Sequence, residues 1–174
     1  MIEKNERTVA NNQHKILSST VSKIVLQEEH FNRQVASLDN LGYKVLRKNQ
    51  LVFSPQNIWM GNINVNLDYD IGIVSPSYKI YEIVKINPLY LSYIIKMNFM
   101  MHKYKECSEQ GASIVRRNLN IDEFFDILIP IPAYHQQEHI VKIISSFITR
   151  YNNEKEMLSK LQVQKTFLLQ SMFI

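Results

Sequence analysis

The stretch from Gln136 to Met172 reads QQEHIVKIISSFITRYNNEKEMLSKLQVQKTFLLQSM and contains neither glycine nor proline. Apolar side chains recur along it at alternating intervals of three and four residues, the period of a helix that packs against another helix. Ten positions follow this alternation, and eight of them are apolar or aromatic: Ile140, Ile144, Phe147, Tyr151, Leu158, Leu161, Leu168 and Met172. We predict one continuous helix on which these residues form a pairing seam.

The length of this helix indicates what covers its seam. At about 1.5 Å per residue the helix would be about 55 Å long. The rest of the chain would form a domain with a radius of gyration of about 14 Å, too small to cover such a helix. Burial of each large seam side chain would contribute up to about 2–3 kcal/mol. We therefore favour a coiled coil with a partner helix over a C-terminal helix packed on its own domain.

The residues before the helix carry the pattern of a β-rich domain. Ile63, Val65 and Leu67 alternate with asparagines, which predicts a strand with the apolar set inward and the asparagines on the opposite face. Further strands are expected over residues 15–21, 42–46, 50–54, 71–74 and 78–84. Residues 1–14 are polar and without a period, so we expect them to be loose.

Helical elements are expected in the second half of this domain. Asn87-Pro88 predicts a helix start, because asparagine caps a helix and proline is accepted at its first position. Apolar residues then recur at helical spacing as far as Tyr104. A short helix over 122–125 leads to the extended strip 127–132, which its prolines keep open. The predicted fold class is α+β, a β-rich domain with packed helices (1–132) followed by one long C-terminal coiled-coil helix (133–174).

Composition narrows the class of protein. The 174 residues carry a net charge of +4 and have a pI of about 9.1, a mild basic excess that suits a polyanionic partner. The single cysteine, Cys107, excludes a disulfide framework or a cysteine-based zinc site within one chain. There is no signal-peptide pattern and no run of the about 18 apolar residues that a membrane span needs. We expect a cytoplasmic protein.

Two motifs favour a structural interpretation over a chemical one. His135 and His139 lie beside Glu138, but not in the His-Glu-x-x-His order of zinc proteases, so we predict a solvated helix start and no metal site. Residues 87–90, Asn-Pro-Leu-Tyr, resemble the Asn-Pro-Pro-Tyr motif with which adenine methyltransferases hold a flipped base. The chain lacks a glycine-rich turn for S-adenosylmethionine, so we interpret Asn87 as a helix cap and predict no catalytic residue.

Five segments, in order, resemble segments of the specificity subunits of type I restriction–modification enzymes. They are Leu46–Phe53, Gly72–Tyr78, Gln110–Leu119, Ile127–Ile140 and Leu158–Phe173. In that family an Ile-Pro-Ile-Pro strip leaves a target recognition domain and enters a conserved spacer helix. The resemblance therefore implies that residues 1–132 form a target recognition domain and that residues 133–174 form a spacer and dimerisation helix.

The same resemblance implies a non-catalytic reader of double-stranded DNA. It would bind one half of a bipartite target and dock methylation and restriction subunits. No cofactor is expected in this chain, because S-adenosylmethionine, ATP and Mg²⁺ would be used by those partners. The usual subunit has two recognition domains and two spacer helices, so we expect a half-subunit that forms a homodimer or pairs with another specificity half. The strand that usually opens the recognition domain is not found before Ile16, so we expect a truncated start.

The predicted DNA contacts are cations for phosphates, and amides or guanidinium groups for base edges. The resemblance places Arg116 and Arg117 in the recognition loop after Gly111. The full predicted set is Arg116, Arg117, Asn118, Ser113, Asn57, Trp59, Asn62, Asn64, Lys44, Arg47 and Lys48. The alternative for each is a solvated surface side chain.

Two other functions stay open at this point. One is a coiled-coil interaction module, or a truncated remnant, that does not bind DNA. The more distant one is a fragment of an adenine-specific DNA methyltransferase, which would bind S-adenosylmethionine by itself.

Overall fold

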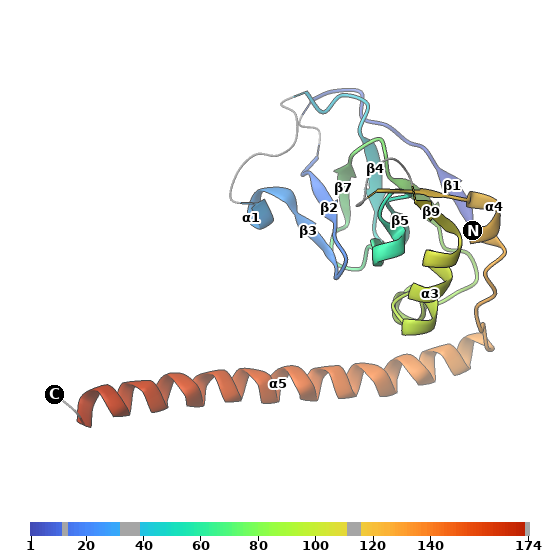
Figure 1. Cartoon of the computed structure of the whole chain (residues 1–174). Coiled ribbons are helices and arrows are strands. Elements are labelled where there is room, and N and C mark those ends of the chain that lie inside the picture. Colours follow the sequence, from blue (N-terminus) through green and yellow to red (C-terminus); the bar gives the residue numbers. More distant parts are fainter. Residues whose placement is uncertain (12–13, 32–38, 111–115, 173–174) are drawn as a thin grey trace. The chain divides into compact units, whose positions relative to one another are not determined.

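The computed structural model describes residues 1–11, 14–31, 39–110 and 116–172. The chain divides into two compact units, Met1–Tyr134 and His135–Ile174, and each is described by itself (Figure 1). None of the described helices combines the length and the apolar character needed to cross a membrane.

The first unit is built on a four-stranded antiparallel sheet in the order β1-β8-β5-β6. Its strands are β1 (Ile2–Lys4), β8 (Lys79–Glu82), β5 (Gln50–Phe53) and β6 (Ile63–Val65). Two further antiparallel pairs are β2 (Leu17–Ser19) with β3 (Ile24–Leu26), and β4 (Lys44–Arg47) with β7 (Ile71–Val74). The predicted strands are thus present, 71–74 with its predicted bounds and most of the others shorter than predicted.

Strand β5 of the four-stranded sheet is buried on both of its faces. Leu51 and Phe53 of β5 belong to one apolar cluster, whereas Val52 between them belongs to a second cluster. The second cluster also contains Leu17 and Leu26, which come from the β2–β3 hairpin. The predicted period-2 alternation along β6 is confirmed, but the asparagine side of that strand is covered as well.

Aromatic rings fill the first cluster. Phe53 stacks on Tyr81 with the two rings parallel and their centroids 5.8 Å apart, and its centroid lies 4.9 Å from that of Phe124. Phe124 comes from α4 (Ile121–Phe125), so this short helix closes the cluster over the sheet. Ile127 and Ile129 of the strip after α4 pack against the same cluster, whereas Leu128 between them points outward and is 91% exposed.

The helix predicted from Asn87 begins as expected. In α2 (Pro88–Ile94) the Asn87 side-chain oxygen accepts hydrogen bonds from the backbone N–H groups of Leu89 and Tyr90, at 3.0 and 3.1 Å. The prediction that one helix continues to Tyr104 is wrong, because the chain turns after α2 and starts again as α3 (Asn98–Glu106). Met97 has extended backbone (φ −68°, ψ 148°) at this break.

Residues 1–14 were predicted to be loose, and for most of this segment that prediction is wrong. Ile2 and Lys4 pair with Glu82 and Ile80 at the edge of the sheet. The Thr8 hydroxyl, on a residue only 4% exposed, donates to the Asn40 carbonyl at 2.9 Å. An edge strand with exposed side chains carries no apolar pattern, so the sequence offered no signal for it.

The remaining elements of the first unit are short. They are α1 (Gln27–Phe31), the 3-10 turn η1 (Ile58–Met60), β9 (Ser108–Gln110) and β10 (Arg117–Leu119). The last two form an antiparallel hairpin where the sequence had indicated only a loop.

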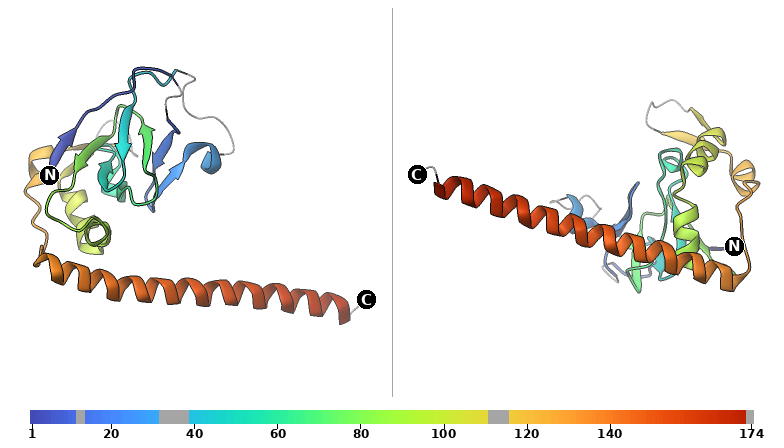
Figure 2. Two further views of the ribbon diagram at one scale, coloured as in Figure 1. Left: turned by 180° about the vertical axis from the view of Figure 1, so that it is seen from behind. Right: turned by 90° about the horizontal axis from the view of Figure 1, so that it is seen from below.

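The second unit is a single helix, α5 (Tyr134–Met172), of 39 residues. Figure 2 shows it as one uninterrupted ribbon, which confirms the predicted long helix. Six of the seam residues are at least half exposed: Phe147, Tyr151, Leu158, Leu161, Leu168 and Met172. The ion pairs Arg150–Glu154 and Glu156–Lys160, each four residues apart, lie on the same helix.

The first cluster predicts a large effect at its centre. Phe53→Ala removes a fully buried ring and should lower the free energy of unfolding by about 3–5 kcal/mol, measured by urea denaturation. Leu128→Ala is the matched control, because that side chain is 91% exposed and its loss should change stability by less than about 0.5 kcal/mol. Equal stability of the two variants would contradict this description of the core.

Candidate nucleic-acid interface

The β9–β10 hairpin carries the predicted recognition residues. Asn118 lies opposite Glu109, and Arg117 lies opposite Gln110. Arg117 and Leu119 are half-buried, whereas Arg116 and Asn118 are exposed, as expected for alternating side chains on a strand. The hairpin therefore presents Arg116 and Asn118 to solvent. Ser113 lies outside the described residues.

Arg117 is docked on the turn that contains Trp59. Its guanidinium carbon lies 4.6 Å from the centroid of the Trp59 ring. Its Nη1 donates to the Ser108 carbonyl at 3.3 Å, and its backbone N–H donates to the Gln56 carbonyl at 3.1 Å. The turn ends at Gly61 (φ 90°), where a Cβ would also lie 2.9 Å from Met101 Sδ, so two constraints favour glycine there.

Within the described residues, three polar atoms around this turn are buried without a hydrogen-bond partner. They are Asn57 Oδ1, Asn62 Oδ1 and Arg117 Nε. Asn57 and Asn62 close the turn together, since the Asn62 backbone N–H donates to the Asn57 carbonyl at 3.3 Å. Buried polar groups are usually paired, so these three unpaired atoms lower the stability of the folded domain.

Lys96, which the sequence did not single out, secures the same turn. Its ammonium group donates to the Gly61 carbonyl at 2.9 Å and to the Val21 carbonyl at 2.7 Å. Burial of the side chain lowers the pKa of Lys96 to about 8. The lysine thus joins the turn after η1 to the turn between β2 and β3.

Asn64 of β6 and Asn62 just before that strand are both buried in the domain. The Asn64 amide donates to Ser19 Oγ and to the Thr20 carbonyl, both at 2.7 Å, and the residue is only 5% exposed. Asn62 is 8% exposed. Because side chains this buried cannot reach a DNA groove, we leave both out of the proposed interface.

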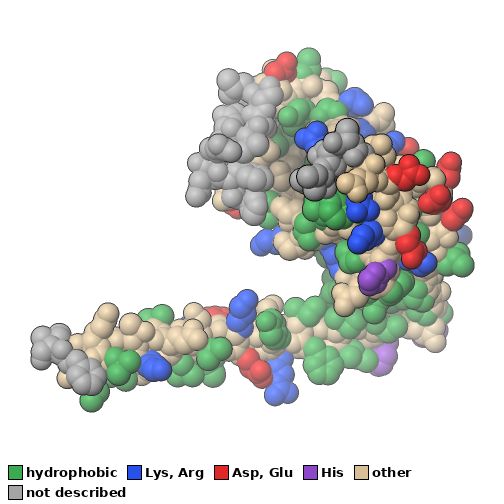
Figure 3. Space-filling model, in the orientation of Figure 1, with side chains coloured by type: hydrophobic (Ala, Val, Ile, Leu, Met, Phe, Trp, Pro, Cys, Tyr) green, Lys and Arg blue, Asp and Glu red, His purple; other side chains and the backbone are tan. Residues whose placement is uncertain are grey.

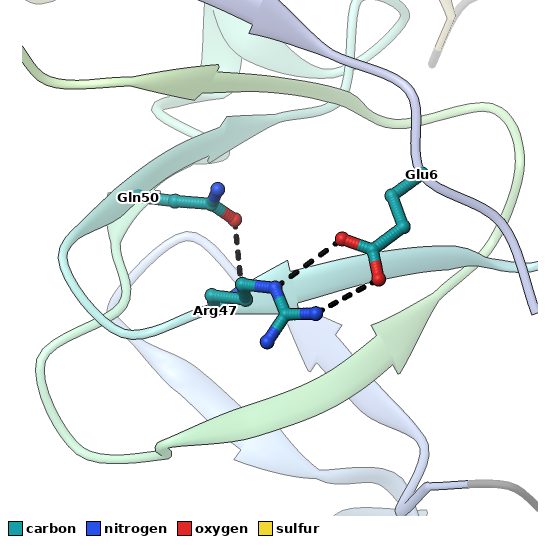
Figure 4. A network of polar contacts seen from close by, with 3 residues as sticks. All are labelled: Glu6, Arg47 and Gln50. Carbon is teal, nitrogen blue, oxygen red and sulfur yellow. Dashed lines mark hydrogen bonds and ion pairs between the residues drawn. The ribbon is translucent and has the colours of Figure 1, made fainter.

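The cations predicted to bind phosphate also have partners within the domain. Lys44 is buried and donates to the Tyr78 carbonyl at 2.7 Å, and its burial lowers its pKa. Arg47 forms a two-pronged contact with Glu6, at 2.8 and 3.2 Å (Figure 4). The Arg47 hydrogen bond lowers the pKa of Glu6. Lys48 lies 3.3 Å from Asp70. These positions therefore offer little uncompensated positive charge to DNA.

Charge is segregated on the face that contains the hairpin. In Figure 3, Lys and Arg side chains gather near the middle of this face, and Asp and Glu gather over α4 and β9. Glu109 belongs to β9 and Asp122 and Glu123 belong to α4, while Glu106 and Asp126 line one pocket with Glu123. Phosphates are repelled by this acidic side, so DNA would approach the part of the face where Lys and Arg side chains gather.

The methyltransferase-like motif has a structural role here. The Asn87 side chain caps α2, and Tyr90 is only 3% exposed, with its hydroxyl donating to the Pro130 carbonyl at 2.9 Å. A ring held in this way cannot stack on a flipped base. Among the described residues, no three His, Cys, Asp or Glu side chains gather as they would around a metal ion.

Comparison with known proteins identifies the family. The model of the type I restriction modification DNA specificity domain matches residues 44–163. The chain therefore belongs to the family of type I restriction modification DNA specificity domains. No curated protein sequence matches the chain significantly.

Two solved structures share the fold. The HsdS subunit from Thermoanaerobacter tengcongensis superposes with a TM-score of 0.62 at 19% identity, over 95% of this chain and 44% of that chain. A chain from a study of complex assembly and conformational transition of the type I R-M system gives a TM-score of 0.61 at 18% identity, over 97% of this chain and 45% of that one. The present chain thus spans just under half the length of these relatives.

The Lys96 ammonium predicts a pH dependence of stability. Between the folded pKa of about 8 and the unfolded value of about 10.4, the unfolded chain binds more protons at Lys96 than the folded chain. The free energy of unfolding should therefore rise with pH across this window, relative to Lys96→Met. After discounting for solvent screening, the relative gain should be on the order of 1 kcal/mol. Urea titrations of both proteins from pH 7 to 10.5 measure it, and parallel pH profiles would contradict it.

Proposed function

We propose that this chain is a specificity half-subunit that reads one half of a bipartite DNA target and catalyses no reaction itself. The observation that carries the proposal is the outward pair formed by Arg116, just before β10, and Asn118 on β10. Membership of the DNA specificity family supports it.

The geometry of the hairpin suits a DNA groove. A two-stranded β-ribbon fits the major groove of B-DNA. Side chains two residues apart on a strand are separated by about 6.6–6.8 Å, close to two base-pair steps of about 3.4 Å. Arg116 could therefore contact guanine or phosphate while Asn118 contacts the edge of a nearby adenine.

The long helix supplies the second part of the function. Its exposed seam, with Phe147 and Leu158 as members, should pair antiparallel with the α5 helix of a second specificity half. If that half is an identical chain, the target is a palindrome with an unread central gap. The paired helices would set the gap length and dock methylation and restriction subunits, where S-adenosylmethionine, ATP and Mg²⁺ would act.

Removal of the outward side chains tests the DNA interface. Arg116→Ala should lower affinity for target DNA and reduce the slope of log K against log salt by about 1 per bound chain, because one cation is lost. Asn118→Ala should lower affinity at an unchanged slope, because the amide is neutral. Fluorescence anisotropy at several salt concentrations measures both quantities.

Lys103→Ala is the matched control for the loss of charge, since Lys103 pairs with Glu106 on the acidic side of the domain. It should leave affinity and slope nearly unchanged. Binding that is insensitive to Arg116→Ala and Asn118→Ala would remove the hairpin from the interface. A well-folded dimer without DNA affinity would instead support the interaction-module alternative.

The seam predicts dimerisation through α5. Leu158→Glu and Leu161→Glu together should convert a dimer into a monomer, because two charges would enter an apolar interface. Lys155→Glu on the same helix is the control and should leave the dimer intact. Size-exclusion chromatography with light scattering gives the mass, and a monomeric wild-type chain would contradict pairing between identical copies.

A further inference from the structure

Arg116 and Arg117 are adjacent in sequence but have opposite surroundings. Arg116 is exposed, and among the described residues no hydrogen bond or ion pair engages its side chain. Arg117 is half-buried, stacked on Trp59 and hydrogen-bonded to Ser108. Two neighbouring arginines are thus suited to different tasks.

The Trp59 ring supports the Arg117 side chain. The separation of 4.6 Å lies within the about 6 Å range of a cation–π contact. The Nε atom of Arg117 is buried, and none of the described residues offers it an acceptor. Moving Arg117 toward DNA would break the ring contact and the bond to Ser108.

The turn that presents Trp59 is itself held firmly. Gln56 accepts the backbone N–H of Arg117 at 3.1 Å, which joins β10 to the turn. At the other end, Lys96 holds the Gly61 carbonyl. Trp59 therefore connects a fixed part of the domain to β10, which carries Asn118 and directly follows Arg116.

We infer that Trp59 is a positioning residue: it fixes Arg117 against η1, and this contact aims Arg116 and Asn118 outward. Arg117 then acts within the protein, and Arg116 is the arginine that meets DNA. The DNA measurements below rest on the proposed function, whereas the fluorescence measurement concerns the free protein alone.

Trp59 is the only tryptophan of the chain, so its fluorescence reports directly on this contact. Arg117→Ala should shift the emission maximum and increase acrylamide quenching, because the ring loses its cover. Arg116→Ala is the matched control and should leave both unchanged. Unchanged quenching in Arg117→Ala, or an equal rise in both variants, would overturn the inference even if the chain did not bind DNA.

DNA binding separates positioning from direct contact. Trp59→Ala and Arg117→Ala should each lower the affinity for DNA about three- to tenfold without changing the salt slope. The double variant should bind no more weakly than the single variant with the larger loss of affinity. Trp59→Phe should recover part of the loss. A slope reduced by about 1 in Arg117→Ala, or additive losses, would show direct DNA contacts and overturn the inference. Circular dichroism and thermal melts confirm that each variant is folded; should Trp59→Ala not fold, Trp59→Phe and Arg117→Ala decide.

Discussion

Strand β5 carries apolar side chains on both of its faces, and much of the first unit is arranged to cover them. Leu51 and Phe53 face the aromatic cluster closed by α4, while Val52 faces the cluster shared with the β2–β3 hairpin. Because the side chains of β5 are buried on both faces, the proposed recognition relies on the β9–β10 hairpin, which is not part of that sheet.

The same burial decides which polar groups remain available to DNA. Asn64 lies on the covered side of β6, and its amide is used to anchor the β2–β3 hairpin. Arg47 and Lys48 are exposed, but nearby carboxylates compensate their charge. Exposed ion pairs of this kind contribute little stability, so their clearest effect is to reduce positive potential on that side of the domain. Positive charge that attracts DNA must therefore come from other residues than Arg47 and Lys48.

Local patterns predicted the local elements well. Asn87-Pro88 predicted a capped helix, and both cap hydrogen bonds are present. The continuous helix α5 followed from periodicity and from the absence of glycine and proline. The prediction failed where long-range contacts override local pattern. Strand β1 is held by its pairing with β8, and the helix break before α3 lets Lys96 reach Val21 and Gly61.

By itself the sequence determined the α+β class, the long C-terminal helix and the resemblance that the family comparison confirms, because these depend on periodicity and on short ordered motifs. Only the tertiary structure decided which candidate DNA contacts are free. The sequence does not distinguish Arg116 from Arg117, and by residue type Asn64 and Asn118 could bind adenine equally well. The difference is burial and hydrogen bonding, which depend on residues far apart in the chain: Trp59 lies under Arg117, and Ser19 holds Asn64.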